Sequence, residues 1–125
     1  MLRFVRILQL TLRLTGLGLL ILGAFIWGGR AELTSAHVAL GALFVLALWC
    51  LSAVGFRRRA ATGLAVRGVI WGAIVLYFGM AQQQLLVGAS HVFIRILHLI
   101  VGLVAIGLGE ALGARIRRAN SALVA

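Results

Sequence analysis

Residues 90–102 read SHVFIRILHLIVG and begin the last of four long apolar runs in the chain. Within this stretch His91, Arg95 and His98 are spaced i, i+4 and i+7, so a helix places all three side chains on one face. Ionisable groups inside an apolar segment of bilayer length are costly, and each is a candidate for a functional role with a specific partner. The stretch therefore predicts a membrane helix with a functional polar face.

The composition is that of an integral membrane protein. Of the 125 residues, 63% are hydrophobic, and the mean hydropathy is +1.15. A soluble domain of this length has far more polar surface. All twelve basic residues are arginines, and they cluster in short segments between the apolar runs, which indicates contact with anionic lipid headgroups rather than with nucleic acid. We expect a lipid bilayer as the main partner and no nucleic acid.

Four apolar runs, residues 7–29, 36–56, 64–81 and 90–114, each approach the length of about 20 residues needed to cross hydrocarbon. No proline or low-complexity segment marks a linker, so residues 1–125 are predicted to form one domain. Short connections favour an all-α, up-down-up-down four-helix bundle. The first run is longer than the core of a signal peptide and lacks a convincing cleavage site, so we expect it to be retained, with its start lying along the interface.

The placement of the arginines predicts the orientation. With a cytoplasmic N-terminus, ten of the twelve arginines lie inside and only Arg30 and Arg95 lie outside. Both termini are therefore expected in the cytoplasm. The use of arginine alone, in a chain rich in Ala, Leu, Val and Gly, points to a bacterial protein of the cytoplasmic (inner) membrane.

Several local features predict how the helices pack and end. The small-xxx-small pairs Gly68/Gly72 and Gly109/Gly113 are expected to let helices approach closely. The Thr34-Ser35 pair is expected to cap the second helix. Cys50 is the only cysteine of the sequence, and we expect it to be a small packing residue.

The three histidines all fall in the outer half of the predicted membrane region. His37 lies 20 residues before Arg57, whereas His98 and His91 lie 17 and 24 residues before Arg115. At about 1.5 Å per residue, His37 is intermediate in depth between the other two, so either one can face it.

A repeated local pattern favours His98 as the residue opposite His37. Residues 37–41 read HVALG and residues 98–102 read HLIVG, so each histidine is followed one turn later by a glycine, Gly41 or Gly102. A glycine at that place removes the side chain that would block a large flat ligand bound to the imidazole. The pattern occurs once in each helical hairpin, as expected of a weak internal duplication.

The geometry of a bundle suggests what the ligand is. Neighbouring helices lie about 8–10 Å apart, too close for two imidazoles with a metalloporphyrin between them. The second and fourth helices of an up-down bundle are diagonal, further apart and parallel, so His37 and His98 reach similar depth. Two imidazoles on haem iron leave no open position for oxygen, which favours electron transfer.

With these features the chain resembles the four-helix membrane b-type cytochromes, the group that includes the cytochrome b561-like proteins and the haem A synthases. The resemblance implies one haem b near the outer face, with His37 and His98 as iron ligands and His91 as the alternative ligand. Many members carry two haems, but three histidines supply one bis-histidine site at most. Electron exchange with quinone or with other membrane redox subunits follows from the same resemblance.

Neighbouring polar residues have both a functional and a simpler interpretation. Arg95 would pair with a haem propionate, or extend to the interface. Residues 82–84, all glutamine, would bind a propionate or a quinone headgroup, or form a polar cap. In the simpler interpretation, His37 and His91 are solvated residues at the starts of helices. His98 would then be satisfied by a hydrogen bond to a backbone carbonyl.

Two other functions stay open. One is a non-catalytic accessory subunit of a larger membrane complex, as a homo- or hetero-oligomer, and the other is a small four-span transporter. A transporter usually needs a carboxylate deep in a helix, whereas Glu110 lies near the inner end, where we expect it to pair with Arg115 or Arg67. No nucleophile–base pair, P-loop or metal-hydrolase motif occurs, so an electron-transfer protein is expected rather than a hydrolase or transferase.

Overall fold

The computed structural model describes residues 1–59, 61–86 and 88–122. Its α-helices are α1 (Leu2–Trp27), α2 (Thr34–Arg57), α3 (Thr62–Ala81) and α4 (His91–Ser121). Two single turns of 3-10 helix, η1 (Ala31–Leu33) and η2 (Gln82–Gln84), lie in the connections. All four α-helices are long and apolar enough to cross a bilayer, so the predicted all-α, four-span architecture is confirmed.

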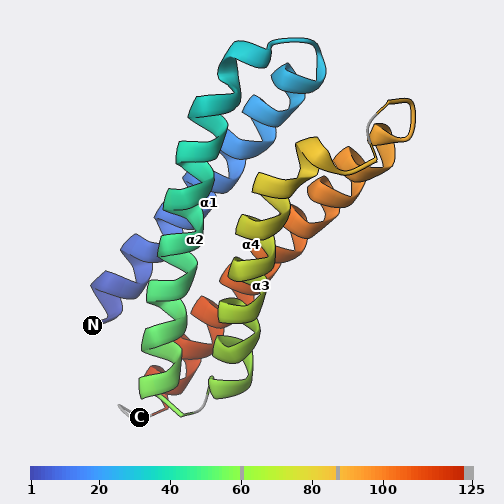
Figure 1. The fold of residues 1–125 in the computed structure, drawn as a ribbon. Coiled ribbons are helices and arrows are strands. Elements are labelled where there is room, and N and C mark those ends of the chain that lie inside the picture. Colours follow the sequence, from blue (N-terminus) through green and yellow to red (C-terminus); the bar gives the residue numbers. More distant parts are fainter. Residues whose placement is uncertain (60, 87, 123–125) are drawn as a thin grey trace.

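The helices form two antiparallel hairpins, α1–α2 and α3–α4, that lie side by side (Figure 1). Each helix packs against the next one in the chain, and α4 also packs against α1, which closes the bundle. The diagonal helices α2 and α4 contact each other across the centre. Both termini lie at one end, and the hairpins diverge toward their loops at the other end (Figure 1).

The buried core lies in the half of the bundle nearer the termini. The largest fully buried side chains are Phe44, Leu48 and Leu51 of α2 and Leu112 and Ile116 of α4. Over residues 17–43 and 73–100, Ile94 is the only buried side chain in the part of the chain that the structure describes. The loop end is therefore packed less tightly than the end with the termini, and all three histidines lie at the loop end.

Glycines of α3 bring this helix close to α2, as their spacing predicts. A Cβ added at Gly68 would collide with the hydroxyl of Ser52, and one added at Gly72 would collide with the indole of Trp49. The same indole N–H donates a hydrogen bond to the carbonyl of Val69, at 3.2 Å. Close approach of the two backbones is thus combined with an interhelical hydrogen bond.

Glycines of α4 have the same effect against α1. A Cβ at Gly109 would lie 3.0 Å from Leu12, and one at Gly113 would overlap the side chain of Gln9. Gln9 is 3% exposed although it is polar. Both predicted small-xxx-small pairs therefore lie at helix–helix contacts.

The helix starts differ from two of our expectations. Residues from Leu2 onward belong to α1, so the start of the chain continues the first membrane helix instead of turning away from it. The expected cap of α2 is also wrong, because none of the described side chains caps this helix. The hydroxyl of Thr34 instead donates a hydrogen bond backward to the carbonyl of Ala31, at 2.7 Å.

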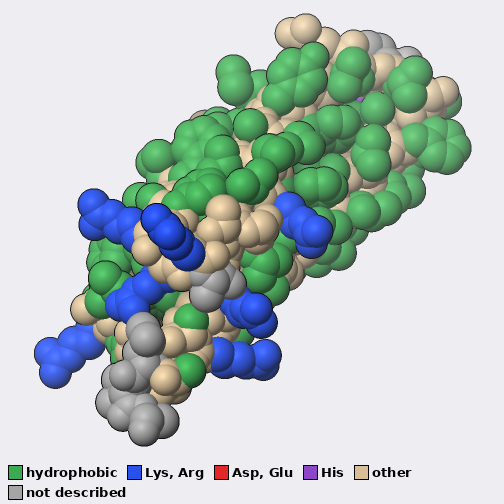
Figure 2. Space-filling model, turned by 90° about the horizontal axis from the view of Figure 1, so that it is seen from below, with side chains coloured by type: hydrophobic (Ala, Val, Ile, Leu, Met, Phe, Trp, Pro, Cys, Tyr) green, Lys and Arg blue, Asp and Glu red, His purple; other side chains and the backbone are tan. Residues whose placement is uncertain are grey.

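The surface is apolar over most of its area and basic at one end. Figure 2 shows arginines gathered at one end of the molecule and apolar side chains over the rest of the visible face. Large apolar side chains such as Leu14, Tyr77 and Met80 are more than 60% exposed. A multi-pass membrane protein presents such side chains to lipid, so this surface agrees with a bilayer as the surroundings of the chain.

Candidate functional site

His37 and His98 face each other near the loop end of the bundle. His37 lies in the first turns of α2 and His98 lies two turns into α4. The centroids of their imidazole rings are 6.1 Å apart, and the ring planes are inclined by 50°. Of the two possible partners for His37, the structure brings His98 into ring contact.

Both imidazoles have a buried nitrogen without a hydrogen-bond partner. The Nδ1 atoms of His37 and of His98 are inaccessible to solvent, and neither makes a hydrogen bond within the described part of the chain. Leaving a buried polar atom unpaired costs free energy, so most such atoms in proteins have a partner. The simpler reading of His98, a hydrogen bond to a neighbouring carbonyl, is therefore not observed for this nitrogen.

The distance between the rings is informative about a ligand. A bond between a metal and an imidazole nitrogen is about 2 Å long, and the ring centre lies about 1 Å beyond that nitrogen. Two imidazoles on opposite sides of one metal ion thus have centroids about 6 Å apart, whatever the angle between their planes. The observed 6.1 Å agrees with this value, and it also lies within the range of about 4.5–7 Å of ordinary ring pairs such as Phe78 and His98.

Residues of α1 and α3 complete the surroundings of the two rings. A Cβ at Gly23 of α1 would lie 3.5 Å from Cε1 of His37, and one at Gly79 of α3 would lie 3.6 Å from Cε1 of His98. The ring of Phe78 stacks on that of His98, with centroids 6.0 Å apart and an angle of 12°. All four helices therefore contribute to the site.

Sequence reasoning missed the site roles of Gly23, Phe78 and Gly79. These residues lie on other helices than the histidines they contact, and no local motif links them. The sequence offers only a weak signal for Gly23 and Gly79, because small residues are common in membrane helices.

The glycines of the two His-x3-Gly segments have different surroundings. A Cβ at Gly41 would make an ordinary contact, at 3.8 Å, with Leu19 of α1. At Gly102 it would meet no atom of the described residues within 4 Å. Open space one turn from the histidine is thus found beside His98, whereas beside His37 the corresponding position faces a neighbouring helix.

His91 begins α4 and contacts the preceding loop. Its Nδ1 lies 3.1 Å from the carbonyl oxygen of Leu85, to which it donates a hydrogen bond when that nitrogen carries the proton. The ring of His91 is not among those that contact His37 or His98 in the described part of the chain. This arrangement fits the interfacial interpretation of His91 better than its role as the alternative ligand.

Arg95 is exposed and lies at the edge of an open hollow. The hollow has a volume of about 420 Å³ and is lined by Gln83 and His91 as well as by Arg95. No ion pair of Arg95 is found among residues 1–59, 61–86 and 88–122. Its guanidinium is thus available to an anionic group at the loop end, about one turn from His98.

The two histidines are not part of a larger group of metal ligands. Among the described residues, no three His, Cys, Asp or Glu side chains lie close enough together to hold one ion. Two ligands are too few for a structural zinc site, which takes four protein ligands. Haem iron, in contrast, brings four nitrogens of its own and needs only two axial ligands.

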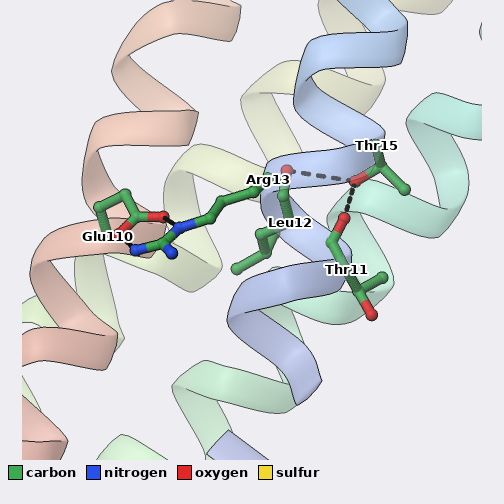
Figure 3. Close-up of polar contacts among 5 residues, drawn as sticks. All are labelled: Thr11, Leu12, Arg13, Thr15 and Glu110. Carbon is green, nitrogen blue, oxygen red and sulfur yellow. Dashed lines mark hydrogen bonds and ion pairs between the residues drawn. The ribbon is translucent and has the colours of Figure 1, made fainter. Parts of the chain in front are cut away.

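Glu110 has a partner that the sequence did not indicate. Nε and Nη2 of Arg13 on α1 donate hydrogen bonds to Oε1 and Oε2 of Glu110 on α4, at 2.6 and 2.8 Å (Figure 3). The sequence instead predicts Arg115 or Arg67 as the partner of Glu110. Arg13 is distant in sequence and comes close only because α1 and α4 are adjacent, so spacing within one helix gave no signal for this pair.

Comparisons of the chain with protein-family models, with curated proteins and with solved structures give no match. The fold itself shows the class of the protein, which is a four-span helical membrane protein. The site is the basis for inferring its function.

Proposed function

We propose that the chain is a small membrane b-type cytochrome that binds one haem b between His37 and His98. The observation that carries this proposal is the pair of imidazoles on the diagonal helices α2 and α4, whose centroids lie 6.1 Å apart. Each has a buried Nδ1 with no partner in the described chain. A metal ion between two rings would pair one nitrogen of each and account for their spacing.

The location of the pair supports haem as the group bound. Both histidines lie in the part of the bundle where the hairpins diverge and where few side chains are buried (Figure 1). A macrocycle needs apolar walls and space between helices, and the open position at Gly102 lies one turn from His98. Among the apolar neighbours, Phe78 stacks on the His98 ring.

The ligand set determines the chemistry. A haem held by His37 and His98 would supply a one-electron redox centre and would leave no open position for oxygen or substrate. The protein's part is to hold both imidazoles in place and to exclude water from the iron. Electron transfer, rather than catalysis on a bound substrate, is the activity that such a site supports.

Charge at the loop end supports the expected role of Arg95. An exposed guanidinium next to a haem site pairs well with a propionate, because a charge-assisted bidentate contact is among the stronger hydrogen bonds. Gln83 lines the same hollow and would donate to a propionate or to a quinone carbonyl. Quinone or another membrane redox subunit would exchange electrons at this end.

The arginine distribution supports a definite orientation in the bacterial cytoplasmic membrane. Arginines cluster at the end that holds both termini (Figure 2), which the positive-inside rule assigns to the cytoplasm. The haem would then lie near the outer face of the membrane.

Haem content of variants tests the proposal. Purified protein from haem-supplied cells should hold about one haem per chain by pyridine haemochrome assay. His37→Ala and His98→Ala should each abolish binding, whereas His91→Ala, the matched control, should retain it. Loss with His91→Ala and retention with His98→Ala would move the ligand to His91, and retention with both His37→Ala and His98→Ala would refute the site.

A further inference from the structure

The ion pair between Arg13 and Glu110 lies on the outside of the bundle. Both side chains come from the adjacent helices α1 and α4, and they remain 59% and 37% exposed although they are bonded to each other. Figure 3 shows the guanidinium and the carboxylate meeting between the two helices. The pair is therefore made within the chain and is still open on one side.

The depth of this pair places it within the hydrocarbon. Arg13 lies 14 residues before the end of α1 at Trp27, about 21 Å along a hydrocarbon layer about 30 Å thick. Glu110 lies five residues before Arg115, about 8 Å inside the level of the arginines near the C-terminus. Both counts put the pair about 8–9 Å below the headgroups.

Charged side chains at such a depth are usually turned to the interior of a bundle or paired in a protected place. Arginine reaches the interface with its long side chain, but glutamate is too short to do so. Here Arg13 extends to Glu110 and makes two hydrogen bonds with it. An exposed ion pair in hydrocarbon is costly unless something other than lipid covers it.

We propose that the α1–α4 face around Arg13 and Glu110 is the contact surface with a second copy of this chain. In a dimer with its two-fold axis along the membrane normal, residues of equal depth meet. Arg13 of one copy then lies next to Glu110 of the other, so the four charges alternate in sign. The surface is self-complementary in charge, which is what a two-fold interface requires.

The neighbouring surface of α4 leaves room for a close partner. Gly107 is exposed and lies one turn from Glu110 on the same side, and a Cβ added there would meet no atom within 4 Å in the described part of the chain. Leu103, one turn further, is 48% exposed. This proposal does not depend on haem binding, because the pair lies toward the other end of the bundle.

Crosslinking in native membranes tests the interface without solubilisation. Cys50, the only cysteine, is replaced by Ala, and single cysteines are introduced by Leu103→Cys, Gly107→Cys or Ala114→Cys on either side of Glu110. Oxidation should join two copies at one or more of these positions, and Ile70→Cys on α3, also exposed, should stay monomeric. Monomer at all three positions, or products of any other mass, would overturn the proposal.

Charge reversal separates contacts between copies from contacts within one copy. Arg13→Glu gives a chain with two carboxylates, and Glu110→Arg gives a chain with two guanidinium groups. Each alone should show about a tenfold or greater loss of crosslinked dimer, because like charges across an interface are disfavoured. Co-expression of the two, with different tags, should restore a mixed dimer.

The rescue is informative because the pair within each chain is broken in both variants, so only charges on the other copy can restore it. Absence of the mixed dimer, with both variants present in the membrane at normal levels, would contradict the alternating arrangement. An unchanged dimer in either single variant would do so as well.

Discussion

The imidazole of His37 on α2 lies against that of His98 on α4, with ring centroids 6.1 Å apart. The two helices are diagonal in the bundle and run in the same direction, so both rings approach from opposite sides at similar depth. Each ring retains an unpaired buried nitrogen in the described chain.

Enlarging Gly79 should displace His98 in a graded manner. An Ala Cβ lies at ordinary contact distance from the imidazole, 3.6 Å from Cε1, so Gly79→Ala should retain haem. Gly79→Leu places further carbons where the ring lies, and haem content should fall to a small fraction of that of the wild type. Haemochrome assays compare the two variants, and equal haem content in both would show that this glycine does not border the ligand.

Gly102 and Gly41 should differ in their effect on haem binding. Gly102→Leu extends into open space beside His98, so it should leave the apo fold intact and block the haem. Gly41→Ala only touches Leu19 and should be neutral. Haem content and the melting temperature of the apo protein are measured together. Normal haem binding by Gly102→Leu would place the macrocycle elsewhere.

Arg95 should raise the reduction potential of the haem. A positive charge near the iron and a propionate favours the reduced form of the haem. Arg95→Gln should therefore lower the midpoint potential by roughly tens of millivolts, as expected for the loss of one charge whose interaction is partly screened by solvent and salt. Potentiometric titration of the visible spectrum measures this change. Arg118→Gln, at the end of α4 far from His98, serves as the control and should leave the potential unchanged.

Gly72 should be intolerant of any side chain. Gly72→Ala drives a methyl group into the indole of Trp49, which is rigid and bonded to the Val69 carbonyl, so we expect a loss of about 1–3 kcal/mol in unfolding free energy. Gly63→Ala, near the start of the same helix, meets none of the described atoms within 4 Å and should be neutral or slightly stabilising. Thermal unfolding in detergent, followed by tryptophan fluorescence, distinguishes them.

The fold was predictable from the sequence because its main determinant is local. A run of about 20 predominantly apolar residues specifies a membrane helix regardless of what packs against it. Helix ends were less predictable, since arginines are good helix formers and α4 continues past Arg118 to Ser121. The wrong expectation for Thr34 has a similar cause, because a threonine near a helix start can bond backward as well as forward.

The candidate site was predictable only in part. The depth of His37 relative to His98 and His91 follows from counting residues, and the structure brings His37 and His98 together. The contacts of Gly23 and Gly79 with the two rings depend on how separate helices rotate against one another, which spacing along one helix does not determine. The same limit applies to the pair of Arg13 and Glu110.

The visible spectrum of the purified wild-type protein tests the central claim most directly. Protein made with ample haem supply should show a Soret band and, after dithionite, a sharp α-band typical of low-spin iron with two axial histidines. A folded protein without these bands, or with a high-spin spectrum that binds carbon monoxide readily, would contradict haem ligation by His37 and His98.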